Sequence, residues 1–416
     1  MQLSVISWIH QPPHVAASAV GQARRYCAIL MGVTLLGAAA VAGVNAAIDP
    51  LAYFTHAHRL NRIQPVFDER AQKTNWLAAR PDQFDAVLLG SSRSTYIDQR
   101  DFAPWRMFNY AVNAMWPGEY REYLDHVAAV NGRPPNLVVL GVDFFGSRRG
   151  IVGQWRPPEY YLKQIGDVGV MSSSLMSLHL LGRSIQTAAL SLGLIGSAEE
   201  MDYYDRNNIR HFKQLINADY RAHEVLHDLA AFKKAVYGHY IYNGDLRRLW
   251  TDLRAAYPNT RFLVFTTPIS DPMFALMVQQ GRLDDYGRWL ADLTAAFGQV
   301  WDFMGLNSVT TDLSRYRDAQ HFDPGIGRLI VDRLLERPLP PEHEDFGRRV
   351  TPGSLPSHLA YIRAQSACLD QDPIGTARAW VQRIGKADGS AGPPAPFWRV
   401  GPAGPCRMAA VEGQTS

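Results

Sequence analysis

The chain has 416 residues, of which 47% are hydrophobic and 19% are charged, and its formal net charge at pH 7 is +3. Such a composition is typical of a globular protein and argues against intrinsic disorder, and so small a net charge does not indicate a nucleic-acid partner. A single α/β domain with an insertion and terminal tails accounts for the length.

The segment 27–48 contains no charged residue and is just long enough to cross a bilayer of about 30 Å as a helix. Arg24 and Arg25 precede it, and Asp49 follows it. The positive-inside bias therefore predicts that residues 1–26 are cytoplasmic and that the rest of the chain lies outside. A cleaved signal peptide and a buried core helix are the alternatives.

Helices and apolar strands alternate after this segment. The pattern predicts a helix at 67–79, strands at 86–89 and 107–111, a helix at 120–130 and a strand at 137–141. Continuous apolar strands of this kind are required by a sheet that is buried on both faces. The alternation therefore favours a parallel sheet.

From about residue 150 to 245 the pattern is helical, without a clear strand, and predicts an insertion. The apolar run 175–196 could be a second membrane span, but His179 and Arg183 interrupt it and favour one face of an inserted helix. The α/β pattern then resumes with a helix at 246–256, a strand at 261–268, a helix at 283–297, a strand at 300–303 and a closing helix at 325–336.

Beyond residue 337 the composition shifts toward Pro, Gly and Ala. Such a segment buries little apolar surface, so residues 338–416 are expected to form a mostly disordered tail. The predicted organisation is a cytoplasmic N-terminus at 1–26, a transmembrane anchor at 27–48, an α/β domain at 49–337 and this tail.

Two short motifs suggest chemistry. The run FDAVLLGSSR at 84–93 is an apolar strand that stops at Gly90-Ser91-Ser92, and open α/β sheets bind ligands at the carboxyl ends of their strands. Near the end of the α/β pattern stands DAQH, in which Asp318 and His321 can meet across one turn. The alternatives are a serine that caps a helix and a solvated turn before the last helix.

Taken with the apolar anchor, these motifs resemble a known group. The other shared features are Asp49-Pro50, a helix with Arg70 and Lys73, FNYAVN at 108–113, LGVDFF at 140–145 and D-x-x-H-F at 318–322. The chain resembles the membrane-anchored SGNH-hydrolase-like proteins of bacterial exopolysaccharide loci. These are GDSL-type esterase relatives, which include proteins that acetylate alginate or cellulose and the D-alanine-transfer protein of teichoic acid modification.

This resemblance covers roughly residues 49–337 without the insertion. It implies a three-layer, flavodoxin-like α/β sandwich with a parallel sheet, for which we expect the strand order 2-1-3-4-5. It also implies that Ser92 is the nucleophile, with Ser91 in the place of the aspartate of G-D-S. His321 would be the base that accepts the Ser92 proton, and Asp318 would hold the imidazole.

The resemblance also implies donors for an oxyanion. The Ser92 amide is the expected first donor, and Ala114 or Asn113 would supply the next. The third block, normally G-x-N-D, reads Gly141-Val142-Asp143 and lacks the asparagine.

Other side chains near the expected site have two interpretations each. Asp143 could bind substrate hydroxyls or cap the following loop, and Arg93 could pair with an anionic sugar or form a structural salt bridge. Trp105, Trp116, Trp155 and Tyr160 could line a carbohydrate groove, although core packing is the commoner role of such residues. No metal-ligand spacing, phosphate loop or dinucleotide motif is present, so we expect no metal and no cofactor.

The expected function is an acyl esterase or transferase, with acetyl as the expected group, that modifies an exopolysaccharide through a seryl ester. The protein would be a single-pass protein of the bacterial inner membrane that faces the periplasm. Its partners would be the polysaccharide, an integral-membrane acyltransferase and a polysaccharide synthase. Two alternatives remain open: an esterase with water as acceptor, and a noncatalytic scaffold that binds polysaccharide or the secretion machinery. Ser91 and the missing asparagine favour the scaffold.

Overall fold

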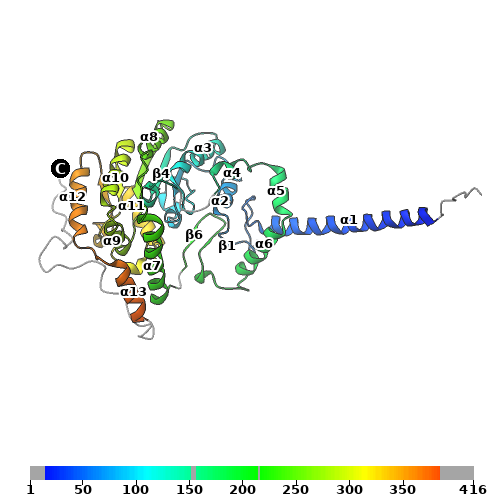
Figure 1. Cartoon of the computed structure of the whole chain (residues 1–416). Helices are drawn as coiled ribbons and strands as arrows, with labels where there is room; N and C mark the ends of the chain where they lie inside the picture. The colour runs from blue at the N-terminus through cyan, green and yellow to red at the C-terminus, as the bar shows by residue number, and fades with distance from the viewer. Residues whose placement is uncertain (1–14, 151–155, 214–215, 385–416) are drawn as a thin grey trace, which may run out of the picture.

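A six-stranded sheet forms the centre of the computed structural model, which describes residues 15–150, 156–213 and 216–384 (Figure 1). The strands lie in the spatial order β3-β2-β4-β7-β8-β9, and the first five are parallel. By chain position, these five have the predicted order 2-1-3-4-5. Their bounds are β2 (Ala86–Gly90), β3 (Met107–Asn109), β4 (Leu137–Val142), β7 (Arg261–Thr266), β8 (Val300–Asp302) and β9 (Arg348–Val350).

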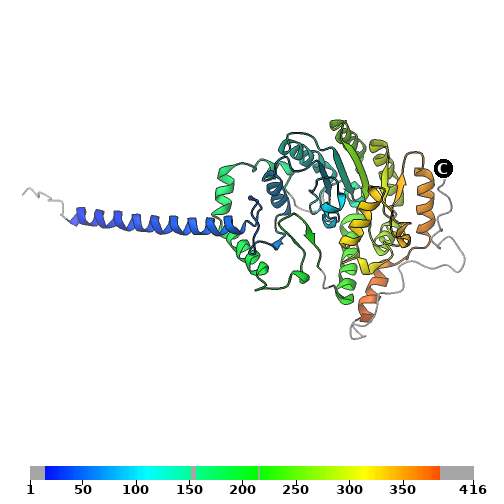
Figure 2. The same cartoon turned by 180° about the vertical axis from the view of Figure 1, so that it is seen from behind.

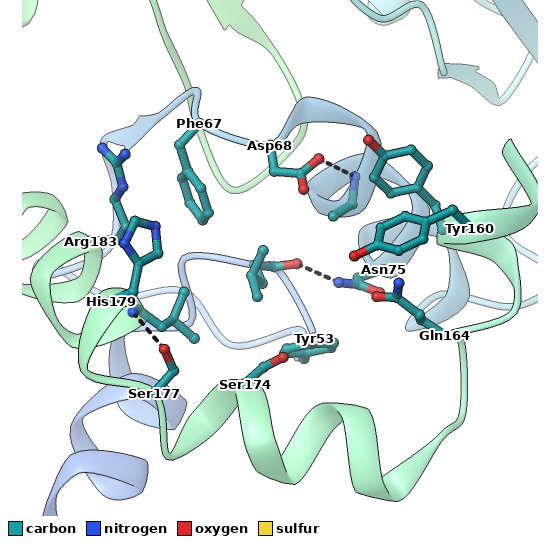
Figure 3. A pocket seen from close by; sticks show the side chains of 14 residues that line it. Tyr53, Phe67, Asp68, Asn75, Tyr160, Gln164, Ser174, Ser177, His179 and Arg183 are labelled. Atoms are coloured by element: carbon teal, nitrogen blue, oxygen red, sulfur yellow. Dashed lines mark hydrogen bonds between the residues drawn. The ribbon is translucent and has the colours of Figure 1, made fainter. Parts of the chain in front are cut away.

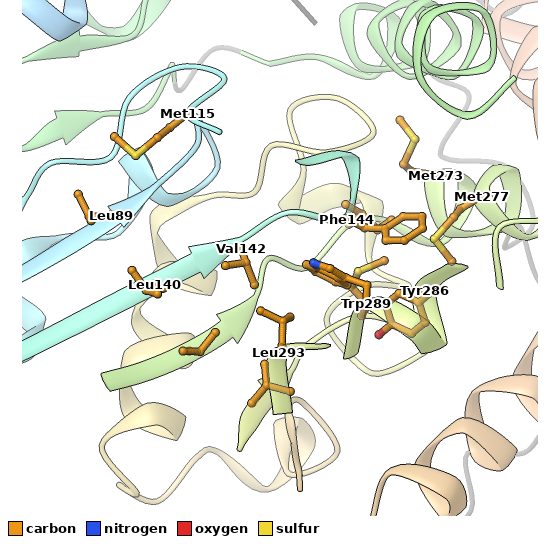
Figure 4. Close-up of a cluster of buried hydrophobic side chains, with 14 of the residues drawn as sticks. Leu89, Met115, Leu140, Val142, Phe144, Met273, Met277, Tyr286, Trp289 and Leu293 are labelled. Atoms are coloured by element: carbon orange, nitrogen blue, oxygen red, sulfur yellow. The ribbon is translucent and has the colours of Figure 1, made fainter. Parts of the chain in front are cut away.

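Both faces of this sheet are buried, which explains its continuous apolar strands. Val87 and Leu89 of β2 enter one hydrophobic cluster, whereas Ala86 and Leu88 enter a second cluster on the opposite face. Figure 4 shows part of the first cluster, which contains Leu89 and Leu140 of the strands together with aromatic residues such as Trp289. The sheet is therefore the middle layer of an α/β sandwich, as predicted.

Helices α2 (Glu69–Ala78), α3 (Tyr120–Val130), α8 (Leu246–Ala256) and α10 (Leu283–Phe297) contribute to the first cluster, and α11 (Pro324–Leu334) contributes to the second. The other α-helices of the described residues are α1 (Val15–Ile48), α4 (Pro158–Leu162), α5 (Val168–Leu175), α6 (Leu178–Ser191), α7 (Ala218–Phe232), α9 (Asp271–Gln279), α12 (Leu355–Ser366) and α13 (Pro373–Ile384).

The insertion after β4 is mainly helical, as predicted, and carries α4 to α7. It also contains two short strands, β5 (Tyr203–Tyr204) and β6 (Arg210–His211), which pair antiparallel with each other. Strand β5 also pairs with β1 (Gln64–Pro65). The expectation of an insertion without strands is wrong in this respect, because strands of two residues are too short to show an alternating pattern.

The expectation of a disordered tail from residue 338 is wrong as far as Ile384. Strand β9 pairs antiparallel with β8, α12 packs against α10, and α13 packs against α7 and α9. The few apolar residues of this segment are concentrated on buried helix faces that include Ile362 and Trp380, so a low apolar content still supplies a packing surface. Residues 385–416, the rest of the predicted tail, lie outside the described residues.

Helix α1 projects from the domain (Figures 1 and 2). Its stretch Val20–Ile48 is long and apolar enough to cross a membrane, and its most apolar part is not buried against the domain. The buried core helix considered as an alternative is therefore excluded. Within the described residues no second helix meets the same criteria, since the apolar run 175–196 is interrupted between α5 and α6.

Candidate active site

Ser92 lies in the turn that follows β2, at the carboxyl end of the sheet. Two glycines allow Ser94, just after this turn, to pack directly against the ends of β2 and β4. Gly90 of β2 is paired with Gly141 of β4, and a Cβ atom at either position would collide with the Ser94 side chain. Ser94 begins a short 3₁₀ helix at Ser94–Tyr96, for which Ser92 supplies no side-chain cap. The capping alternative for Ser92 is therefore not what the structure shows.

The structure brings Ser92, His321 and Asp318 into one hydrogen-bonded series. Ser92 Oγ lies 2.9 Å from His321 Nε2, and His321 Nδ1 lies 2.7 Å from Asp318 Oδ2. Asp318 is buried, while the His321 side chain keeps 14% of its surface exposed. A serine that reaches solvent is thus connected to a buried carboxylate through an imidazole.

The DAQH segment is held as a tight turn by its own aspartate. Asp318 Oδ1 accepts hydrogen bonds from the amides of Gln320, at 2.9 Å, and His321, at 2.7 Å. Ser270 Oγ donates to Ala319 O at 2.6 Å, which fixes the turn to the loop after β7. Because one carboxylate shapes the turn and contacts the imidazole, the three-residue spacing of Asp318 and His321 has a direct structural reason.

Electrostatics fixes the proton positions in this series. Burial opposes the ionisation of Asp318, but His321 and Arg317 outweigh it and hold the pKa of Asp318 far below its ordinary value. An ionised carboxylate can only accept hydrogen bonds, so His321 Nδ1 donates to it, and in the neutral imidazole Nε2 is then the nitrogen that accepts from the Ser92 hydroxyl. This is the arrangement that a general base next to a nucleophile requires.

Arg93 and Asp143 form a buried salt bridge behind the nucleophile. Arg93 Nη1 donates to Asp143 Oδ1 at 3.0 Å and to Thr267 Oγ1 at 3.1 Å, and Arg93 Nη2 donates to Gln320 Oε1 at 2.9 Å. The Asp143 side chain forms no cap for the 3₁₀ helix that follows it. Arg93 therefore links the end of β4 to the DAQH turn; substrate binding by either residue stays a prediction.

The loop 109–114 runs past the end of β2, where Val112 N donates to Gly90 O at 3.0 Å. Ala114 has a left-handed φ of +49°. Within residues 15–150, 156–213 and 216–384, the amides of Ser92 and Ala114 donate to no protein acceptor. The side chain of Asn113 is exposed, and the backbone amide of Asn113 donates to Glu69 Oε2 at 2.5 Å. Ala114 is thus the better placed of the two predicted residues to offer a free backbone donor.

Three charged residues of α2, all buried, hold this loop. Glu69 accepts the Asn113 amide, and Arg70 Nη1 donates to Asn113 O at 2.9 Å. Lys73 Nζ donates to Asn109 O at 3.0 Å and to Ala111 O at 2.6 Å. Burial lowers the pKa of Lys73 to about 7. Sequence reasoning names Arg70 and Lys73 only as shared motif residues and does not name Glu69. The pattern that could have indicated their role is three charged residues on one helix that directly precedes the strand β2.

The insertion places two carboxylates near the catalytic candidates. Asp202 is paired with Arg317, whose Nε also lies 3.3 Å from Asp318 Oδ2. Asp228 of α7 accepts from Gln320 Nε2 at 3.2 Å. Burial and then the negative charge of Asp318 raise the pKa of Asp228 to about 8. Sequence reasoning missed both residues, because contacts between distant segments leave no local pattern.

A separate cavity of about 330 Å³ lies between α2 and the inserted helices α4 to α6 (Figure 3). Tyr160, one of the aromatic candidates for a carbohydrate groove, lines it. Trp116 is buried instead, and Trp155 lies outside the described residues. In the part of the chain that the structure describes, no group of three or more His, Cys, Asp or Glu residues could hold a metal ion.

Comparisons with known proteins add little to this geometry. No family model matches the chain, and no curated protein matches it. A solved structure from Streptococcus pneumonia, provisionally described as a platelet activating factor, matches with a TM-score of 0.31 and 10% identity over 64% of this chain and 89% of that chain. A likeness this distant supports no functional argument, so the interpretation of the site rests on its own contacts.

Proposed function

We propose that the chain is an SGNH-type serine acyl esterase or acyltransferase that carries an acyl group, in our proposal acetyl, as an ester on Ser92. The observation that carries the proposal is the series of hydrogen bonds from Ser92 through His321 to Asp318. A nucleophile, its base and the carboxylate that orients the base are the three parts that acyl transfer by a serine requires.

In the first half of the reaction, Ser92 Oγ attacks the acyl carbonyl carbon while His321 Nε2 takes the hydroxyl proton. Asp318 stabilises the imidazolium that forms. The tetrahedral intermediate then expels the alcohol of the donor ester, which receives the proton from His321, and the acyl group stays on Ser92. In the second half, water or a sugar hydroxyl gives its proton to His321 and attacks the carbonyl carbon of the seryl ester. The bond from Ser92 Oγ to that carbon then breaks, His321 returns the proton to Ser92 Oγ, and the acid or the acylated sugar leaves.

The negative oxygen of each tetrahedral intermediate needs donors that are in place beforehand. The free amides of Ser92 and Ala114 are the candidates, and Asn113 could add its exposed side chain. Loss of a single such donor costs about 3 to 4 kcal/mol in other serine enzymes. The buried charges of α2 that hold the loop 109–114 would keep the Ala114 amide in position.

The cellular setting is part of the same proposal. Helix α1 would anchor the protein in the bacterial inner membrane, and Arg24 and Arg25 would keep its N-terminal end in the cytoplasm and the domain in the periplasm. The motif resemblance, and not the geometry, suggests an exopolysaccharide as acceptor or substrate. It also suggests an integral-membrane acyltransferase and a polysaccharide synthase as partners.

The test is hydrolysis of an activated acetyl ester by the purified full-length chain. We expect acetate release from wild type, and we expect Ser92→Ala to abolish it. Ser91→Ala is the matched control, since Ser91 lies in the same turn and, within the described residues, its hydroxyl makes a single long contact, accepted from the Arg93 amide at 3.4 Å. Equal activity of wild type and Ser92→Ala would exclude Ser92 as the nucleophile.

A noncatalytic scaffold is the second candidate, and Asp143 is the observation that favours it. Asp143 occupies the strand end where the proteins that the motifs resemble carry asparagine. Its Oδ1 accepts from Arg93 and Thr267, and a carboxylate offers no donor to an oxyanion. If the wild-type chain neither releases acetate nor reacts with a serine-directed phosphonate, the scaffold becomes the better explanation.

A further inference from the structure

Helix α6 exposes an apolar stripe that the fold leaves uncovered. Leu178, Ile185 and Leu192 are spaced seven residues apart, so they lie along one face of the helix. Their exposed fractions are 73%, 59% and 46%. The stripe continues past the end of the helix into Leu194, which is 72% exposed. A surface helix of a soluble protein normally exposes polar residues to water, so this apolar face indicates contact with another protein or with a membrane.

The other face of α6 is already used. Leu180, Thr187 and Leu190 are buried, and α6 packs against the C-terminal end of α1. The whole stretch 168–198 contains no Asp or Glu, and Arg183 is its one Lys or Arg. A surface with so little charge is unusual in water, where charged side chains normally interrupt apolar patches.

The position of this surface is fixed by α1. Asn45 Nδ2 donates to Leu175 O at 2.7 Å and to Ser177 O at 3.1 Å, which are the residues where α5 meets α6. Ser184 Oγ donates to Asn45 Oδ1 at 2.7 Å. In both Figure 1 and Figure 2, α5 and α6 flank the base of α1, on the side of the domain from which that helix projects.

The depth of this junction follows from helix geometry. Arg24 and Arg25 mark the last charged residues before the apolar stretch of α1. About 20 helical residues cross the roughly 30 Å apolar layer of a bilayer, which takes the helix from Tyr26 to Asn45. The junction of α5 and α6 therefore lies at the level where α1 leaves the membrane.

We propose that α5 and α6 lie in the surface of the bilayer that α1 crosses, with Leu178, Ile185, Leu192 and Leu194 inserted among the lipids. Helix α6 has 14 residues and a length of about 21 Å, too short to span, which suits a helix that lies along the interface. A bilayer is the occupant favoured over protein because this surface is continuous with a membrane-crossing helix and lies at interfacial depth. Together, α1 and α6 would hold the domain against the membrane.

The experiment places an environment-sensitive fluorescent amino acid at single positions of the full-length chain in lipid nanodiscs. With the probe at Leu178, we expect blue-shifted emission and strong quenching by lipids spin-labelled near the headgroup. A probe at Leu36 of α1 should be quenched by lipids labelled in mid-chain, which shows that the chain is inserted. A probe at exposed Ala360 of α12 should be quenched by neither lipid.

A matched pair of variants sharpens the result. Ile185→Ser removes part of the stripe and should weaken the quenching at Leu178 without changing it at Leu36. Ile241→Ser, at an isoleucine of similar exposure outside the stripe, should change neither. The proposal is overturned if the Leu178 probe behaves like the Ala360 probe. It is also overturned if the emission is blue-shifted but not quenched by lipid, since a second copy or a membrane protein would then cover the stripe.

Discussion

Two regions of the molecule meet at Ser92, the turn with Asp318 and His321 and the loop 109–114, and they are held in place in different ways. On one side, Asp318 and His321 contact each other within a single tight turn, and His321 contacts Ser92 through a direct side-chain hydrogen bond. On the other side, the loop 109–114 offers backbone amides, and its shape depends on buried charges of helix α2. The comparison teaches that two short motifs, one with Ser92 and one with Asp318 and His321, each show their role in the local sequence. The loop 109–114, which carries the proposed oxyanion donors, depends instead on charged residues of a helix about 40 residues earlier in the chain.

The largest effect is expected for His321→Ala. Without the base, the Ser92 hydroxyl keeps its proton, and kcat should fall by roughly 10⁴- to 10⁶-fold. The measurement is the rate of acetate release from an activated ester by the full-length variant. His239→Ala, at an exposed histidine away from the series, is the control and should keep wild-type rates. A residual rate within tenfold of wild type would contradict the role of His321 as the base.

Asp318→Asn should have the next largest effect, about 10⁴-fold on kcat. An asparagine Oδ1 can still accept the amides of Gln320 and His321, so the turn should persist. However, the amide no longer favours a proton on His321 Nδ1. The same ester assay measures the loss, and Asp284→Asn at a 92% exposed side chain serves as control. An active Asp318→Asn enzyme would mean that the carboxylate only shapes the turn.

Glu69→Gln tests the other half of the comparison. It removes a negative charge that holds the Asn113 amide and the Tyr204 hydroxyl, so the loop should shift slightly. We expect kcat to fall by up to about 10²-fold with little change in KM, because a misplaced donor affects the transition state more than substrate binding. Glu342→Gln, at an exposed glutamate, is the control. If KM rises and kcat is unchanged, Glu69 contributes to binding and not to positioning.

The smallest effect concerns Asp228 and appears as a dependence of stability on pH. The folded-state pKa of Asp228 is raised from its ordinary value of 3.8 to about 8, so the folded chain binds this proton more tightly than the unfolded chain. Its contribution to stability is complete below about pH 4 and is lost as the pH rises through about 8. Asp228→Asn stays neutral and should gain stability relative to wild type over this range. Thermal unfolding of both proteins at pH 5 and pH 8.5 measures the difference, and identical shifts would contradict the assignment.

The sequence predicted the features that depend on local pattern. Apolar strands such as 137–141, the turn with Ser92 and the spacing of Asp318 and His321 follow from short-range chemistry, whereas the expected five-strand order came from the motif resemblance. The folded segment that ends at Ile384 was missed because Trp380 and its few apolar neighbours make a buried face only when α13 is formed. Asp228 was missed because its proximity to the DAQH turn depends on how the insertion folds back.

The central claim is that Ser92 becomes acylated, and mass spectrometry of the trapped intermediate tests it most directly. The full-length chain is incubated with an activated acetyl ester, quenched in acid and digested. The account predicts one added acetyl group on Ser92 in wild type and none at this position in His321→Ala. Acetylation on another residue, or an unmodified Ser92 in a chain that still releases acetate, would contradict it.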